Sequence, residues 1–413
     1  MLDLLIRRCR LPERDTPVDV GIADAAITAI GTVAESACET IDARGRLLTP
    51  GLVESHIHLD KALLAGRVAT AAGTLEEAIQ VTGDAKRRFT VDDIRARARR
   101  VLDLAVAAGT TAMRTHVEVD PILGLVALDA IRPLREEYAP AIDLQICAFA
   151  QEGIVKSPGT EELLRRALGG GADLVGGCPY NDTDARTHIR TVFALARSFD
   201  VDADFHVDFF DEPEHLHVRD IIEETIAQGW EGRVAVGHLT ELAALDEITG
   251  NAIIAALADA RIGVIALPAT DLYLMGRSDA FNVRRGLAPL RRLLRAGVSV
   301  ALATNNVRNP FTPVGTADLA HQTFVAAVAG HMGSDADLRD LLRMITEHPA
   351  QILRRDRYGI VVGARADLVL WDAERPEDIA ASLPARVAVV KAGRVSVECE
   401  ARVRWRWREE VIR

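Results

Sequence analysis

Apolar and polar positions divide the chain into three stretches with different patterns. Residues 1–50 and 356–413 form short alternating runs interrupted by turn residues, a pattern typical of β-strands. Between them, eight apolar runs are separated by segments that carry helix start and stop signals. The eight runs predict strands at 51–60, 110–119, 142–151, 172–180, 201–210, 233–239, 261–270 and 297–306.

The spacing of these runs indicates a barrel. Most successive strands begin about 30 residues apart, the length of one strand–helix unit, and the longer first interval leaves room for an extra active-site loop. Thr90 and Gly109 bracket one helical segment as an N-cap and a C-cap would. An open doubly wound sheet would carry a glycine-rich phosphate turn after its first strand, where this chain has His-Ile-His-Leu-Asp. We therefore predict an α/β fold built on a (β/α)8 TIM barrel.

Composition argues against some classes of partner and indicates a cellular compartment. Across 413 residues, 60 Asp and Glu outnumber 49 Lys and Arg, and the net charge of −11 argues against nucleic acid as a partner. The five cysteines are dispersed without a CxxC pair, which favours a reducing compartment over a disulfide framework. No apolar run approaches the ~18 residues that a membrane span needs. We predict a cytoplasmic protein with neither a nucleic-acid nor a membrane partner.

Polar residues gather where the predicted strands end. His56 and His58 lie two residues apart in the first strand, so both imidazoles point to the same side and can share one divalent cation. Barrel enzymes keep their catalytic groups at the carboxyl ends of strands, which is where this pair falls. Other predicted strands end in the same way, at His116, Gln151, His206, His238 and the pair Asn305–Asn306. Their convergence on one rim indicates an active site.

The segment LLTPGLVESHIHLDKA resembles the opening of the amidohydrolase superfamily. The resemblance is closest to the branch of cytosine deaminase and N-isopropylammelide isopropylamidohydrolase. It continues through TAMRTHVEVD, IDLQICAFAQEGI, LMGRSDAFNVRRG, NPFTPVGTADL and YGIVVGARADLVLWDA. It implies a hydrolase of a non-peptide C–N bond in a small cyclic amidine or amide, such as a deaminase of a pyrimidine, triazine or related N-heterocycle.

The same resemblance implies a domain organisation and an assembly. Residues 51–355 would form the catalytic barrel. Both chain termini, 1–50 and 356–413, would build one small composite β-sandwich domain. A homo-oligomer is an expectation by analogy with the family.

Carried over position by position, the resemblance also implies a metal centre. His56, His58 and His206 would be ligands of one divalent metal ion, with Asn305 at the position of a further ligand. Imidazole suits zinc and iron alike, and manganese is a third candidate. His238 would polarise the attacking water or the substrate. Three neutral imidazoles leave coordination positions open for a water, whose pKa the ion lowers toward neutrality.

Two positions depart from the family pattern. Asn305 stands where the family has an aspartate that accepts a proton from water, and Phe209 stands where the cytosine-deaminase pattern has a proton-shuttling glutamate. Asp208 lies two residues past His206, on the same predicted strand face, and is a candidate catalytic replacement. Two more acidic residues follow in the loop, Asp211 and Glu212.

Three hypotheses account for these departures. The chain is a hydrolase with a rearranged proton path, or it binds a heterocycle with little or no turnover, or Asn305 is an engineered substitution in an active hydrolase. The leading hypothesis is the first, because the metal histidines, His238 and Gln151 are all present.

Several residues near the rim are candidate substrate contacts. Gln151 has the paired donor and acceptor that suit the amide-like edge of a flat heterocycle. Lys61 either meets a carbonyl-rich or anionic ring or forms a salt bridge with a nearby carboxylate. Arg114 is expected to pair with a buried carboxylate. The remaining candidates for substrate binding are Asp60, Tyr180 and Tyr273.

Overall fold

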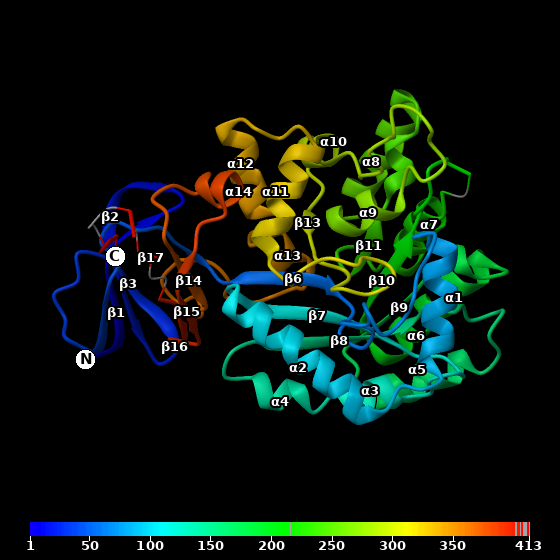
Figure 1. The fold of residues 1–413 in the computed structure, drawn as a ribbon, viewed down its shortest axis with the longest axis horizontal. Helices are drawn as coiled ribbons and strands as arrows, with labels where there is room; N and C mark the ends of the chain where they lie inside the picture. Colours follow the sequence, from blue (N-terminus) through cyan, green and yellow to red (C-terminus); the bar gives the residue numbers. More distant parts are fainter. Residues whose placement is uncertain (215, 401–402, 405, 408–410, 413) are drawn as a thin grey trace.

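Eight parallel strands form the centre of the fold, and each lies within its predicted range (Figure 1). The computed structural model describes residues 1–413 except 215, 401–402, 405, 408–410 and 413. Each barrel strand pairs with its neighbour in the sequence. The strands are β6 Leu52–Ile57, β7 Thr110–Glu118, β8 Asp143–Ala150, β9 Leu174–Gly177, β10 Asp202–Val207, β11 Val234–His238, β12 Gly263–Ala266 and β13 Val300–Leu302.

Asn305, in the segment after the last barrel strand, forms backbone hydrogen bonds with the first barrel strand and the residue that follows it. The Asn305 N–H donates to the His56 carbonyl at 2.8 Å, and the Asn305 carbonyl accepts from the His58 N–H at 2.9 Å. The barrel therefore closes at a residue predicted to belong to the active site.

Helices occupy the intervals between the strands (Figure 1). The helix predicted from Thr90 and Gly109 is α2, where the Thr90 side chain accepts the Asp93 N–H. The long first interval holds an additional helix, α1, which stands across the carboxyl ends of the strands (Figure 1). The α-helices up to the last barrel strand are α1 Leu75–Lys86, α2 Val91–Ala107, α3 Val126–Ile131, α4 Leu134–Tyr138, α5 Thr160–Gly169, α6 Ala185–Phe199, α7 Val218–Gln228, α8 Glu247–Asp259, α9 Pro268–Leu274 and α10 Leu290–Arg295. The later ones are α11 Leu319–Ala329, α12 Asp335–Arg343, α13 Glu347–Ile352 and α14 Asp378–Ser382.

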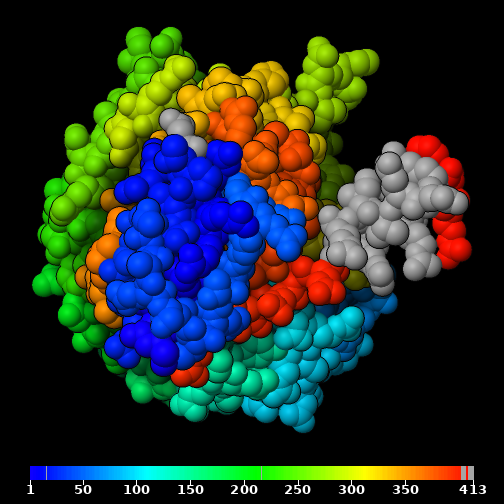
Figure 2. All heavy atoms as spheres, turned by 90° about the vertical axis from the view of Figure 1, so that its left-hand side faces the viewer, coloured from blue at the N-terminus to red at the C-terminus, as the bar shows by residue number. Residues whose placement is uncertain are grey.

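The two chain ends supply separate β-sheets that share a core. One sheet has the order β3-β2-β1-β4, and another has the order β16-β15-β14-β5. Leu4, Ile22, Leu48, Leu368 and Val390 belong to one buried cluster between them. Figure 2 shows the blue N-terminal segment beside orange and red C-terminal segments. The strands are β1 Leu2–Leu11, β2 Arg14–Ala23, β3 Ala26–Gly31, β4 Ala37–Asp42, β5 Leu48–Pro50, β14 Leu368–Trp371, β15 Arg386–Lys391, β16 Arg394–Glu398, β17 Val403–Arg404 and β18 Val411–Ile412.

The predicted fold class is confirmed, because a barrel of eight parallel strands is accompanied by sheets built from both termini. The predicted domain boundaries stay a prediction, and the terminal range includes residues outside those described. Among the described residues, no helix combines the length and the apolar character required to span a bilayer.

A buried lysine connects the terminal sheets to the barrel. Lys391 donates to Asp367 at 2.8 Å, to Asp143 at 2.9 Å and to the Thr111 carbonyl at 2.7 Å. Asp143 begins barrel strand β8, whereas Lys391 ends β15. This ion-pair cluster therefore holds the two parts of the chain together.

Lys391→Met should destabilise the protein, because it leaves two carboxylates without their buried partner. We expect the free energy of unfolding to fall by about 3 kcal/mol, as for other buried pairs that lose one member. Urea titration measures this value. The control is Lys156→Met, which removes the same charge from an exposed site and should change stability by less than about 0.5 kcal/mol. Equal effects of the two variants would contradict the assignment.

Candidate active site

Four imidazoles meet at the carboxyl end of the barrel. His56 and His58 come from the end of β6, His206 from β10 and His238 from the last position of β11. The Nε2 atoms of His56 and His206 are 2.6 Å apart. The ring centroids of His58 and His206 are 5.3 Å apart. One ligand atom from each of His56, His58 and His206 lies within 4.8 Å of the others.

The chemistry of this group suits a divalent cation. Burial lowers the pKa of all three imidazoles well below the usual value. The crowding of several imidazoles lowers it further, as does the Lys61 ammonium for His58 and His206. The rings are therefore neutral and present lone pairs, which metal ligation requires. Among the described residues, the buried Oδ1 of Asn305 has no hydrogen-bond partner. The predicted metal ligands thus fit an ion, with a neutral amide in place of a carboxylate.

A charged cluster lies behind the candidate metal ligands. As expected, Arg114 pairs with a buried carboxylate, that of Asp204, at 2.8 Å. His116 lies 3.3 Å from the other oxygen of Asp204 and stacks on His56 with ring centroids 3.8 Å apart. These residues support one face of His56.

His238 has a partner that the sequence analysis missed. Its Nδ1 lies 2.7 Å from Oδ1 of Asp271, a buried residue of α9, and Asp271 Oδ2 accepts the Leu267 N–H at 3.1 Å. The ring of Phe209 stacks on His238 with centroids 3.8 Å apart. Asp271 follows the seventh predicted strand by one residue, and this position was the only signal that pointed to it. The contact leaves Nε2 of His238 available to a molecule in the cavity.

Three of the four imidazoles, His58, His206 and His238, line a small cavity of about 240 Å³. Its lining includes the cation of Lys61 but no carboxylate, and three aromatic rings contribute to its walls. Leu75 of α1 lines it as well and belongs to an apolar cluster with Phe209 and Phe311, so α1 covers the mouth. The lining residues are His58, Lys61, Leu75, Gln151, Tyr180, His206, Phe209, His238, Thr270, Asn305, Asn306 and Phe311.

Three of the predicted substrate contacts line the cavity: Lys61, Gln151 and Tyr180. Lys61 fits both interpretations of its role, because its Nζ pairs with Glu118 at 2.7 Å and also faces the cavity. The same ammonium donates to Gln151 Oε1 at 3.2 Å.

The other two predicted substrate contacts have different surroundings. Asp60 is buried and accepts the backbone N–H groups of Lys61 and Glu118 at 2.8 Å each, so its carboxylate connects the segment after β6 to the end of β7. Tyr273 packs against the apolar cluster beside α1, with the guanidinium of Arg277 over its ring. Neither residue lines the cavity.

The carboxylates expected near His206 also point elsewhere. Strand β10 ends at Val207, and Asp208 has a φ of 51°, so the alternation that placed it beside His206 ends one residue too early. Asp208 accepts the N–H groups of His217 and Val218 at the start of α7. The other two acidic residues make contacts within the loop region. Asp211 accepts the Gly276 N–H, and Glu212 forms an ion pair with Arg284.

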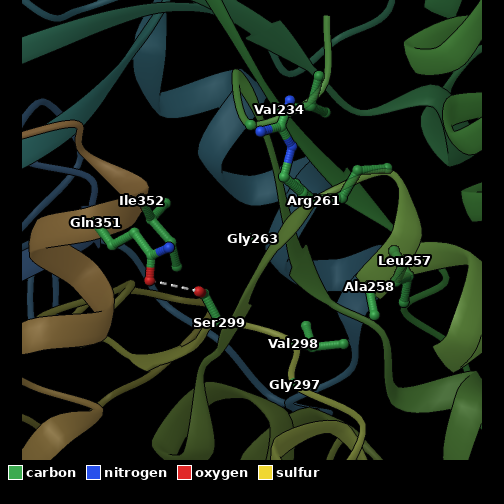
Figure 3. A pocket seen from close by; sticks show the side chains of 12 residues that line it. Val234, Leu257, Ala258, Arg261, Gly263, Gly297, Val298, Ser299, Gln351 and Ile352 are labelled. Carbon is green, nitrogen blue, oxygen red and sulfur yellow. Dashed lines mark hydrogen bonds between the residues drawn. The ribbon is translucent and has the colours of Figure 1, made fainter.

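A second cavity lies at the opposite, amino end of the strands (Figure 3). Its lining includes Arg261, Ser299 and Gln351, and the Ser299 hydroxyl donates to Gln351 Oε1 at 2.8 Å. None of the predicted site residues lines it. The groups capable of acid–base and metal chemistry are therefore concentrated at the carboxyl end.

Comparisons with known proteins agree with this geometry. Residues 39–397 match the amidohydrolase family. The chain is 29% identical to N-isopropylammelide isopropyl amidohydrolase of Pseudomonas sp. (strain ADP), over 96% of this chain and 98% of the relative. It is 30% identical to a pterin deaminase of Rhizobium rhizogenes, over 91% and 87%. The crystal structure of 5-methylcytosine deaminase from Klebsiella pneumoniae with 5-fluorocytosine superposes with a TM-score of 0.93, at 30% identity, over 97% of this chain and 99% of that one.

His206→Ala should abolish metal retention, because it removes one of three imidazoles that share an ion. Elemental analysis of protein purified without chelator should give about one divalent ion per chain for the wild type and less than about a tenth of that for the variant. The exposed His321 provides the control, and His321→Ala should keep its metal. Full metal content in His206→Ala would remove this residue from the ligand set.

Proposed function

This chain belongs to the amidohydrolase family and is a hydrolase of C–N bonds, and we propose that it cleaves a non-peptide C–N bond of a small, flat N-heterocycle. A deaminase of a cyclic amidine or amide is the simplest case. One observation carries the proposal. Three neutral imidazoles that can share a cation meet beside one small cavity, and a fourth imidazole, paired to a buried aspartate, lines the same cavity.

The cavity suits an aromatic ring with hydrogen-bond acceptors. The relatives named above act, by their names, on N-isopropylammelide, pterin and 5-methylcytosine, which are all flat N-heterocycles. Phe209, Phe311 and Tyr180 offer apolar faces to such a ring. Gln151 Oε1 accepts from Lys61, and its NH2 group donates to Cys178 Sγ at 3.3 Å. The Lys61 ammonium and the second N–H of that NH2 group are therefore the donors we assign to ring carbonyl oxygens.

His56, His58, His206 and Oδ1 of Asn305 would hold the metal ion, with zinc, iron and manganese as candidates. A bound divalent cation supplies a hydroxide nucleophile near neutral pH by lowering the pKa of a bound water. Asn305 carries no charge and cannot accept the proton of that water. A different residue must therefore take it.

We assign the proton transfer to His238. The Asp271 carboxylate at Nδ1 holds the ring in the tautomer that leaves Nε2 unprotonated, as the aspartate does in Ser-His-Asp triads. Nε2 accepts the proton of the attacking water and returns it to the leaving nitrogen. Phe209, stacked on the ring, keeps it in place and excludes water from that face. This path requires neither a carboxylate at position 305 nor one at position 209.

A substrate panel tests the function. Wild-type protein loaded with Zn²⁺, Fe²⁺ or Mn²⁺ is incubated with pyrimidines, pterins and triazines, and released ammonia or amine is measured. We expect turnover with at least one ring and none after metal removal. Binding of a ring without any release would favour a heterocycle-binding protein instead.

Cytoplasmic location and a homo-oligomeric state remain predictions, and we expect neither a nucleic-acid nor a membrane partner.

Asp271→Asn should reduce kcat strongly, because an amide at this position allows the wrong tautomer of His238. We expect a loss of about 10³-fold with metal retained, by analogy with the aspartate of catalytic triads. The matched control is Asp208→Asn, another buried aspartate, which contacts α7 and should leave kcat within about threefold of the wild-type value. Comparable losses in both variants would argue against a special role for Asp271.

Asn305→Asp should tighten metal binding, because a carboxylate is a charged ligand and the amide oxygen is neutral. We expect that removing the metal from Asn305→Asp requires an about tenfold higher chelator concentration than removing it from the wild type. Competition with a coloured chelator measures the change, and Asn306→Asp is the neighbouring control. Unchanged retention would show that position 305 does not contact the ion.

A further inference from the structure

Lysine is rare in this chain, and its placement is informative. The 49 Lys and Arg residues include only four lysines, at positions 61, 86, 156 and 391. Lys61 and Lys86 are both buried and both pair with Glu118. An ammonium is a compact charge with three donors, unlike the planar guanidinium. Two of four lysines thus lie in one buried cluster at the mouth of the barrel.

Lys86 is the last residue of α1, the helix that covers the cavity. Its ammonium is surrounded by three carboxylates, with oxygens at 2.6 Å in Glu118, 2.9 Å in Asp120 and 2.6 Å in Glu152. Glu118 ends β7, and Asp120 and Glu152 follow the ends of β7 and β8. Lys86 therefore attaches the end of α1 to two neighbouring barrel strands.

The same carboxylates hold the polar residues of the cavity. Burial raises the pKa of Glu118, but Lys61 and Lys86 together lower it to about 2, so this residue is ionised. Its Oε2 faces Lys86, and its Oε1 accepts from Lys61. Glu152, another Lys86 partner, is the residue next to Gln151. The two polar side chains assigned to substrate binding are therefore both linked to a carboxylate that pairs with Lys86. Lys61 contacts Glu118, and Gln151 is the sequence neighbour of Glu152.

The Lys61 ammonium uses two of its three N–H groups in hydrogen bonds with protein acceptors. Its Nζ donates to Glu118 and to Gln151 Oε1, and it lies 4.5 Å from the centroid of the Phe311 ring. An ammonium has three N–H bonds. Among the described residues no acceptor for the third is found, and Lys61 lines the cavity. Because the shorter of its two hydrogen bonds is to Glu118, a shift of that carboxylate would change the direction in which the third N–H points.

We propose that Lys86 is a positioning residue that, through Glu118, directs the Lys61 ammonium toward the substrate beneath α1. The inference rests on the proposed function, because it assumes that a ring occupies the cavity. With α1 in place, Lys86 occupies Oε2 of Glu118 and leaves only Oε1 to Lys61. Without Lys86, both oxygens of Glu118 compete for Lys61 and draw it away from the ring.

A double-mutant cycle tests the coupling. Barbituric acid, a flat anionic ring with three carbonyl oxygens, is titrated calorimetrically into metal-loaded wild-type protein, Lys86→Met, Lys61→Met and the double variant. We expect Lys86→Met to weaken binding about tenfold, the value of one charge-assisted hydrogen bond. In the Lys61→Met background, the same substitution should change the affinity less than about twofold. Equal weakening in both backgrounds would overturn the proposal, because a purely structural Lys86 would act without Lys61.

Arg87→Met is the matched control, since it removes an exposed positive charge one residue further along and should not change the affinity. If Lys86→Met does not fold, Lys86→Arg replaces it in the cycle. The planar guanidinium of Lys86→Arg cannot reproduce the three carboxylate contacts that the compact ammonium makes. We therefore expect this variant to bind barbituric acid about threefold more weakly, and only when Lys61 is present.

Lysine labelling gives a second measurement that needs neither ligand nor turnover. With four lysines, mass spectrometry assigns each site after treatment with an amine-reactive reagent. Lys61 labelling should rise at least about fivefold in Lys86→Met, because covering by α1 protects it, and stay constant in Arg87→Met. Unchanged labelling would overturn the proposal. Increased labelling in a protein that hydrolyses no ring would leave the coupling intact and reject only the proposed function.

Discussion

Closure of the barrel at Asn305 is the constraint on which the candidate site depends. The backbone of Asn305 exchanges hydrogen bonds with His56 and His58, so the first strand and the end of the last meet at the candidate metal ligands. The buried carboxylate of Glu54 reinforces this seam by accepting the N–H groups of Thr304 and His56. Because backbone hydrogen bonds allow little variation in distance, the imidazoles and the Asn305 amide oxygen are brought together before any ligand binds.

Burial then determines the ionisation of the groups around this seam. Desolvation lowers the pKa values of the three imidazoles that could share an ion, those of His56, His58 and His206, so they are neutral. Charged groups in the same layer are paired, as in Arg114 with Asp204 and Lys61 with Glu118. Unpaired charges in such an interior would be strongly unfavourable. The site therefore offers lone pairs for a cation and, in its lining, one ammonium for a substrate.

The strands and the gathering of histidines at the barrel mouth could be predicted from the sequence, whereas the contact of His238 with Asp271 could not. All eight barrel strands lie in their predicted ranges, because buried parallel strands are continuous apolar runs. The prediction for Asp208 assumed that strand alternation continued past Val207, and a left-handed backbone at Asp208 ended it. Asp60 was similarly placed near the rim, but its carboxylate is occupied by two backbone N–H groups.

The sequence by itself determined the barrel, because eight apolar runs alternate with helical segments at the spacing of strand–helix units. It also placed His56 and His58 on a common side, because a strand backbone repeats every two residues. Tertiary structure alone decided that Asp271 meets His238, 33 residues away, and that Lys86 reaches Glu118 from a helix laid across the strand ends. Such contacts depend on where loops and helices pack after leaving the strands. No short-range pattern encodes that packing, because it results from burying apolar faces such as that of α1 against distant parts of the chain.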